Sequence, residues 1–201
     1  MNYLAHMFLS GHDDGLMIGN FIADAVKGNR MNDYPDAVRN GIRLHRAIDT
    51  FTDQHAITAI GRERLHPHFH KYSGVVVDMY FDHFLASNWS MWSTEPLRDF
   101  TSRNYGILAR NFLQLPARSR RMLPFMVRDN WLLSYARLEH LDKAFRGMAQ
   151  RTIFRSGMEL ATEVLRDQYD EFRVEFLDFF PEIITHTDHW RGESPPKVSL
   201  H

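Results

Sequence analysis

Two pairs of potential metal ligands in this sequence are spaced so that each pair falls on one side of a helix. His45 and Asp49 are four residues apart in LHRAID, and Asp78 and Asp82 repeat the spacing in DMYFDH, which ends on His83. Side chains at positions i and i+4 lie on one helix face, with Cβ atoms about 6 Å apart. An exposed polar stripe would explain one such pair. Two pairs in otherwise apolar segments favour a buried site with oxygen and nitrogen ligands, which suits manganese, iron, magnesium or zinc.

Other residues near these pairs are candidates for the same site. Asp24 lies near the end of an apolar segment, where a cation, or a salt bridge to Lys27 or Arg46, would offset the negative end of a helix dipole. Arg43 and Arg46 flank His45 and are candidates for holding a phosphate. Asp82 and His83 point about 100° apart on a helix, so we expect Asp82 to be the ligand and leave the role of His83 open.

The remaining histidines are weaker candidates. His6 lies in an apolar N-terminal segment, where a histidine is more often a core residue than a ligand. His66, His68 and His70 alternate around Pro67 in what is expected to be a loop.

Helix signals run through the chain, and no set of alternating strands is visible. We expect helices over about 16–26, capped by Asp13-Asp14, from Pro35 through 51, after Ser73-Gly74, after Thr94-Glu95-Pro96, from about 116 and over 138–148. The clearest apolar pattern is a long C-terminal helix over 165–183, which Pro181 is expected to kink or shorten. The prediction is one all-α domain over residues 1–191 with about seven to nine helices, followed by a mobile tail over 192–201.

Composition sets limits on function. The chain has 201 residues, 44% of them hydrophobic and 24% charged, and no cysteine, which excludes disulfides and thiolate ligands. The N-terminus lacks the features of a signal peptide, and no apolar run reaches the roughly 20 residues that span a bilayer. We therefore expect a cytoplasmic protein with no membrane partner. Motifs for nucleophile elbows, phosphate-binding loops and nucleic-acid binding are missing.

The net charge of −1 hides two charged segments. One is rich in arginine: Arg98, Arg103, Arg110, Arg118, Arg120, Arg121 and Arg128. The other is acidic: Asp167, Asp170, Glu171, Glu175, Asp178, Glu182 and Asp188. The arginine segment either attracts an acidic partner or is complemented within the fold by the acidic segment.

Four short motifs occur in one order: MNYLAH, GNFIADAVKG, LHRAIDTFTD and DMYFDHFLASNWS. From Met1 to about Pro181 the chain resembles the acyl carrier protein phosphodiesterases. The resemblance implies an all-helical, HD-like fold, support by manganese or another divalent ion such as magnesium, and hydrolytic removal of 4′-phosphopantetheine from holo acyl carrier protein, an acidic protein. The adjacent His-Asp pair of ordinary HD enzymes is absent, and Asp82-His83 has the reverse order.

The resemblance and the residues together predict a set of roles. Asp24, His45, Asp49 and Asp82 would hold the metal, and Asp78 or His83 would take a proton or orient water. Arg43 or Arg46 would stabilise charge on the phosphoryl oxygens, and the stretch from Arg98 to Arg128 would bind the carrier protein. Two alternatives stay open: an HD-like hydrolase of nucleotides or other small phosphodiesters, and a helical module that binds an acidic protein without catalysis. The oligomeric state is left open.

Overall fold

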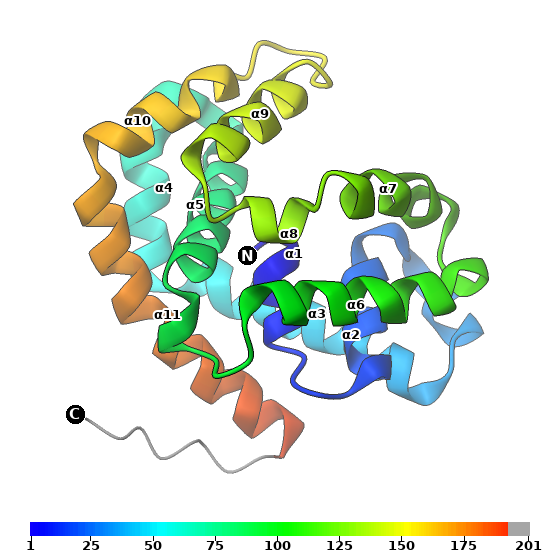
Figure 1. Cartoon of the computed structure of the whole chain (residues 1–201). Helices are drawn as coiled ribbons and strands as arrows, with labels where there is room; N and C mark the ends of the chain where they lie inside the picture. Colours follow the sequence, from blue (N-terminus) through cyan, green and yellow to red (C-terminus); the bar gives the residue numbers. More distant parts are fainter. Residues whose placement is uncertain (193–201) are drawn as a thin grey trace.

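The computed structural model describes residues 1–192, so the predicted tail lies outside the described residues apart from Gly192. This part of the chain contains eleven α-helices joined by short 3₁₀ turns and loops, with no strand (Figure 1). The helices are α1 (Tyr3–Phe8), α2 (Asp14–Ile22), α3 (Asp36–Gln54), α4 (Ala56–Phe69), α5 (Ser73–Ser87), α6 (Leu97–Arg110), α7 (Ala117–Arg128), α8 (Trp131–Ser134), α9 (Leu138–Ala149), α10 (Ala161–Asp167) and α11 (Tyr169–Arg191). The all-α prediction is confirmed, and the short α1, α8 and α10 account for the larger number of helices.

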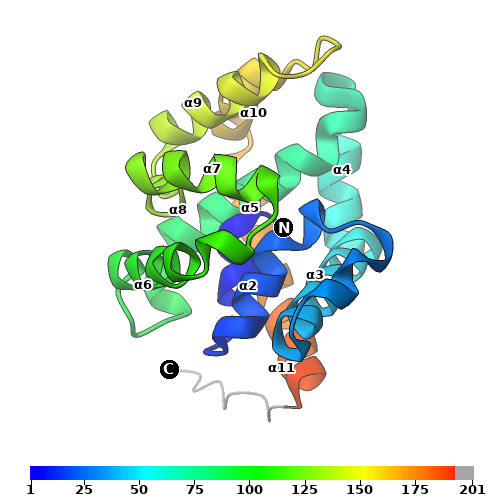
Figure 2. The ribbon, with the colours of Figure 1, turned by 90° about the vertical axis from the view of Figure 1, so that its right-hand side faces the viewer.

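Helix α5 lies at the centre of the fold and carries much of the core. Helices α1, α4, α9 and α11 all pack against it (Figures 1 and 2). Its side chains are apolar on nearly every side, as expected for a helix that is surrounded by others. Phe81, Phe84 and Leu85, for example, are almost fully buried.

Helices α2 and α3 cross at two glycines, Gly19 and Gly41, where their backbones approach each other closely. A Cβ atom on Gly19 would overlap the backbone oxygen of Val38, and one on Gly41 would overlap the backbone oxygen of Leu16. The two backbones therefore touch where any side chain would separate them. Residues that follow these glycines, among them Asn20 in α2, are brought close to α3 as a result.

Helix α1 has no local cap and depends on Asp82 of α5. The carboxylate of Asp82 accepts hydrogen bonds from the backbone N–H groups of Leu4 at 2.8 Å and of Asn2 and Ala5 at 3.2 Å. These are the N–H groups that lack a partner at the start of a helix. Asp82 is fully buried, and burial raises its pKa to about 7 even though these donors favour the charged form. The contacts of Asp82 therefore fix the position of α1.

Three local expectations were wrong. The segment His66 to His70 is no loop: α4 continues through Pro67 to Phe69, because Leu65 and Phe69 are both held in the core. The expected C-terminal helix is interrupted at Gln168, so that α10 packs against α9 while α11 packs against α3, α4 and α5. Pro181 does not end α11, which extends to Arg191.

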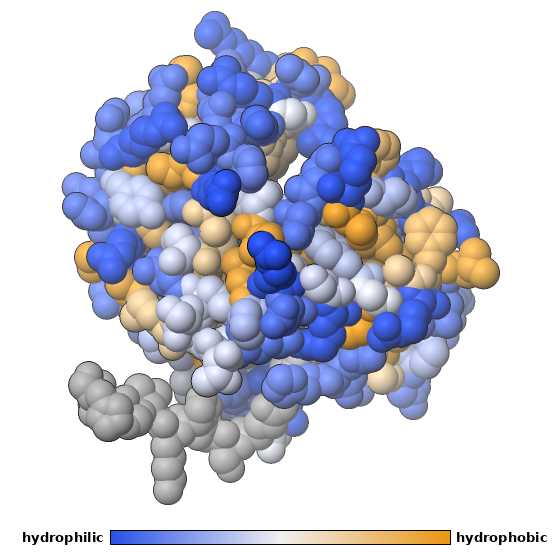
Figure 3. All heavy atoms as spheres, viewed as in Figure 1, coloured by the Kyte–Doolittle hydropathy of each residue, from blue (hydrophilic) through white to orange (hydrophobic). Residues whose placement is uncertain are grey.

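The surface and the helices show no membrane-spanning feature in the described part. None of the helices within residues 1–192 combines the length and the apolar character that crossing a bilayer requires. On the face drawn in Figure 3, hydrophobic side chains lie among hydrophilic ones and do not gather into one large patch.

Candidate metal centre

A cavity of about 240 Å³ opens where α1, α2 and α3 meet. Its walls carry half of the eight site residues that the sequence predicted, together with several residues that it did not predict. The lining consists of Met1, Asn2, Tyr3, His6, Asn20, Asp24, His45, Asp49, Thr52, Asp53 and Asp78. The helices that were expected to carry ligands therefore do meet, with α1 inserted between them.

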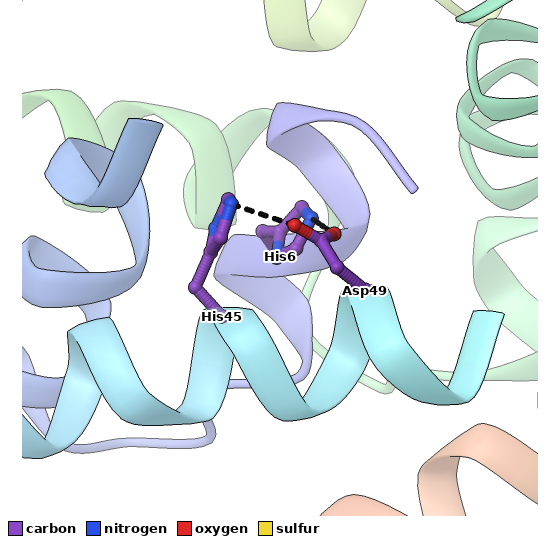
Figure 4. Close-up of side chains that lie close together, drawn as sticks. All are labelled: His6, His45 and Asp49. Carbon is purple, nitrogen blue, oxygen red and sulfur yellow. Dashed lines mark ion pairs between the residues drawn. The ribbon is translucent and has the colours of Figure 1, made fainter. Parts of the chain in front are cut away.

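Two histidines and two carboxylates converge in this cavity. Nε2 of His45 lies 3.1 Å from Oδ2 of Asp49, its i+4 neighbour on α3, and 3.3 Å from Oδ1 of Asp24. Nε2 of His6, from α1, lies 3.2 Å from Oδ1 of Asp49. Figure 4 shows His45 and Asp49 rising from one side of α3 toward His6. His6, His45 and Asp49 each offer a ligand atom within 4.8 Å of the others, which is the spacing that a single metal ion needs.

Asn20 orients both imidazole rings. Its Oδ1 lies 2.7 Å from Nδ1 of His6 and 3.0 Å from Nδ1 of His45, and the rings stack with centroids 4.1 Å apart. The Nδ2 group of Asn20 donates to the backbone oxygen of His6 and to the hydroxyl of Ser10, which fixes the amide so that Oδ1 faces the rings. Both histidines therefore donate Nδ1–H to Asn20 and present Nε2 to the cavity.

The electrostatics of the group favour a cation. Burial opposes charge on His45, but hydrogen bonds to Asp24 and Asp49 outweigh it and raise the pKa of His45 to about 9. For Asp49, burial is likewise outweighed by the neighbouring His45 and His6, which lower its pKa. The hydrogen bond to His45 also lowers the pKa of Asp24. The two carboxylates are thus negative, and they stabilise a positive charge beside them, here the proton on His45.

His6 shows why a metal ion suits this site. Burial lowers its pKa, and the positive charge of His45 lowers it further, whereas the neighbouring Asp49 opposes this shift. A neutral His6 that donates Nδ1–H to Asn20 has a lone pair on Nε2, and that lone pair faces a carboxylate oxygen. A cation between the two atoms removes this repulsion. Two imidazole nitrogens with carboxylate oxygens form a donor set that manganese, iron and zinc accept. The second ring nitrogen of each histidine is engaged, as is usual for metal ligands.

Comparisons with known proteins place this site in a family. The sequence profile of the family described as acyl carrier protein phosphodiesterase matches residues 1–183. The chain belongs to this family. A relative from Photorhabdus laumondii, named acyl carrier protein phosphodiesterase, is 30% identical over 90% of this chain and 92% of its own length. Relatives of the same name from Klebsiella pneumoniae and Escherichia coli are 29% and 27% identical, over 92% and 94% of this chain and 96% and 98% of their own. No solved structure matches this chain, so the likeness to HD enzymes stays a prediction.

The structure brings some of the predicted site residues to the cavity of this family member and leaves others outside. Asp24, His45, Asp49 and Asp78 line it. Asp78 also accepts a hydrogen bond at 2.8 Å from the Met1 ammonium group.

The other predicted site residues lie outside the lining. Asp82 binds the start of α1, as described above. Nδ1 of His83 is 2.7 Å from the backbone oxygen of Tyr135 and Nε2 is 3.0 Å from the hydroxyl of Tyr169. Arg43 and Arg46 are both exposed, and Arg43 donates to Asn40.

Two residues of the group were undervalued by sequence reasoning. His6 was expected to be a core residue, and Asn20 was not considered. The sequence held no signal for Asn20, because only the structure shows that α2 and α3 cross at the preceding glycine. His6 reaches the cavity because α1 is attached to α5 through the bond between Leu4 and Asp82, which are 78 positions apart. No pattern of neighbouring residues indicates a contact over that distance.

Proposed function

We propose that this chain is a metal-dependent phosphodiester hydrolase that removes 4′-phosphopantetheine from holo acyl carrier protein and leaves the apo protein. The observation that carries the proposal is the convergence of two oriented imidazoles and two carboxylates in one open cavity of a chain from this family. The bond to be broken is the phosphodiester between a serine of the carrier and the prosthetic group. That reaction needs a polarised phosphoryl group and an activated water, and a bound divalent ion, proposed to be manganese, supplies both.

We propose His6, His45 and Asp49 as the protein ligands of this ion, with Asp24 as the fourth. Asn20 holds both rings so that their Nε2 atoms face the cavity, where they would bind the ion. Asp24 is the most exposed of the four, with a side chain 66% accessible, so it borders the open side where the substrate enters. This set differs from the predicted one in replacing Asp82 by His6, because the contacts of Asp82 favour a role in positioning α1.

Asp78 is the proposed residue for handling a proton. Its carboxylate lies on the cavity wall, and the hydrogen bond from the Met1 ammonium group fixes one of its oxygens. A fixed carboxylate beside the ligand group can orient the attacking water and accept its proton. The mechanism assigns no step to His83, whose ring nitrogens are both engaged, or to the exposed Arg43 and Arg46.

Intact mass spectrometry of holo acyl carrier protein tests this function. After incubation with the protein and Mn²⁺, we expect the carrier to lose the mass of phosphopantetheine, and to keep it when EDTA is present. A carrier that stays intact, while small phosphodiesters or nucleotides are cleaved, would instead support the alternative hydrolase. Intact carrier and intact small substrates with tight binding of the carrier would support the non-catalytic module.

A matched pair of variants tests the ligand group. Asp49→Asn removes a carboxylate from the cavity, whereas Asp36→Asn removes an exposed carboxylate at the start of the same helix. We expect turnover to fall at least about a hundredfold for Asp49→Asn, since a ligand and a charge are lost together. Asp36→Asn should retain turnover within about twofold. Equal turnover of the two variants would remove Asp49 from the site.

A further inference from the structure

Helix α7 contributes no side chain to the cavity lining, but it contacts Tyr3, which does. Tyr3 lines the cavity, and its hydroxyl lies 3.4 Å from the sulfur of Met122, in the middle of α7. The contact between Tyr3 and Met122 places α7 beside the N-terminal segment, and Figure 2 shows one end of α7 close to the start of the chain. Burial raises the pKa of Tyr3, the charge of Asp24 raises it further, and the charge of Arg118 opposes this. The Tyr3 hydroxyl thus lies within the electrostatic reach of both a proposed metal ligand and an arginine of α7.

Helix α7 exposes positive charge beside an aromatic ring. Arg118, Met122 and Phe125 follow at helical spacing and share one face with the neighbouring Arg121. Both arginines are exposed, and the Phe125 ring is 51% accessible. Over α7 in Figure 3, strongly hydrophilic and hydrophobic side chains lie side by side. We call the surface made by Arg118, Arg121 and Phe125 the α7 face.

The positive charge of the α7 face is not offset by ion pairs. Within residues 1–192, neither Arg118 nor Arg121 has a carboxylate within 4.0 Å. Elsewhere in the arginine-rich segment, Arg103 pairs with Glu95 and Arg128 pairs with Asp129. The acidic partners in these pairs, Glu95 and Asp129, lie outside the acidic segment over 167–188. These ion pairs therefore do not support the alternative that the acidic segment neutralises the arginine-rich segment. The two arginines of the α7 face thus remain available to a partner.

The cavity itself has the opposite charge. Four carboxylates line it: Asp24, Asp49, Asp53 and Asp78. The Met1 ammonium group pairs with Asp78 and Arg62 pairs with Asp53. The net negative charge therefore comes from Asp24 and Asp49, which His45 offsets only in part. An anionic partner is therefore attracted by the α7 face and not by the interior of the cavity. Arginine and aromatic residues next to each other are also the composition that protein interfaces favour.

We propose that the α7 face is the docking surface for an acidic face of the carrier protein whose prosthetic arm enters the cavity. This inference rests on the proposed function, which supplies the carrier as the partner. The unpaired arginines specify the charge of the docking face, and the contact of Tyr3 with α7 places that face beside the ligand group. The proposal also restricts the docking surface, which the sequence predicted over Arg98 to Arg128, to the single helix α7.

Charge reversal on α7 tests the docking surface. The variant Arg118→Glu/Arg121→Glu is compared with Arg166→Glu, which reverses an exposed arginine on α10, far from α7 in Figure 1. We expect kcat/KM for holo carrier protein to fall at least about tenfold for the double variant, chiefly through KM. Its dependence on salt should be weaker than that of the wild type. Arg166→Glu should stay within about twofold, and Mn²⁺ affinity should be unchanged in all three proteins.

Several outcomes separate this inference from the function on which it rests. Wild-type protein that leaves holo carrier intact would overturn the proposed function. Active wild type with equal kcat/KM for both charge variants would overturn only the docking surface. If the double variant unfolds at a lower temperature than the wild type, Arg118→Gln/Arg121→Gln replaces it. This neutral variant should lose about half of the effect on a logarithmic scale, and full activity would contradict the proposal.

Discussion

Replacing Asn20 by leucine should weaken metal binding although Asn20 itself is not a proposed ligand. Oδ1 of Asn20 accepts Nδ1–H from both His6 and His45, so leucine removes the common partner of the two rings. Loss of one such partner typically lowers metal affinity about 10–100-fold, or ~1.4 to ~2.7 kcal/mol. Because one oxygen serves both histidines, we expect the Asn20→Leu variant to lose about a hundredfold, near the upper end of that range.

Asn20→Asp is the matched control. Aspartate keeps an oxygen that accepts from both imidazoles and loses the two N–H bonds that Nδ2 makes. The backbone oxygen of His6 retains the hydroxyl of Ser10 as a donor, at 2.8 Å. We therefore expect Asn20→Asp to bind Mn²⁺ within about tenfold of the wild type.

Calorimetric titration of the EDTA-treated and dialysed proteins with Mn²⁺ measures these affinities, and thermal unfolding shows whether each variant is folded. The ratio of the two variants separates the loss of ring orientation from a general loss of stability. Wild-type affinity in Asn20→Leu would refute the reasoning, because the rings would then not need Asn20. Equal weakening in both variants would also refute it, because the acceptor oxygen would not be the decisive feature.

Three further predictions follow from the same geometry. Since the pKa of His45 is raised to about 9, Mn²⁺ must displace a proton from His45 when it binds. The apparent Mn²⁺ affinity should therefore rise about tenfold per pH unit from neutrality and level off above pH ~9. An affinity that is flat over this range would contradict the ligand role of His45. Gly19→Ala, which forces a methyl group onto the backbone oxygen of Val38, should lower the free energy of unfolding by about 3 kcal/mol or more in denaturant titrations and weaken Mn²⁺ binding with it, whereas unchanged stability would show that α2 can shift freely. Asp82→Ala leaves three backbone N–H groups at the start of α1 without an acceptor, which should lower the free energy of unfolding by about 3 kcal/mol. The variant should still bind one Mn²⁺ per chain at saturation. Full stability combined with loss of Mn²⁺ binding would restore Asp82 as a ligand.

The sequence alone indicated where several helices begin and which side chains share a face of the same helix. Asp13 caps α2 through a 2.8 Å bond from the backbone N–H of Leu16, and α3, α6 and α7 each begin directly after a proline. These signals act over one turn of chain, so they can be read residue by residue. The same is true of His45 and Asp49, whose common face follows from the helical repeat alone.

Local signals failed where packing over long distances decided the outcome. The histidines around Pro67 were expected in a loop, but the burial of Leu65 and Phe69 holds that segment in a helix. Asp78 and Asp82 have the same spacing as His45 and Asp49, yet one lines the cavity and the other binds the backbone of α1. A spacing rule gives the direction of a side chain from its helix, and it does not say what lies there.

The tertiary structure alone decided which side chains meet in the candidate metal centre. His6 reaches Asp49 because Asp82 holds α1 against α5, and Asn20 reaches both histidines because the glycines of α2 and α3 let two backbones touch. Each of these contacts joins segments that are remote in sequence. Their geometry depends on the packing of the whole helix set, whereas the helical repeat fixes only neighbours within a few residues. For this reason the sequence predicted the kind of chemistry and the pair of His45 and Asp49, and the fold determined which other residues lie in the candidate site.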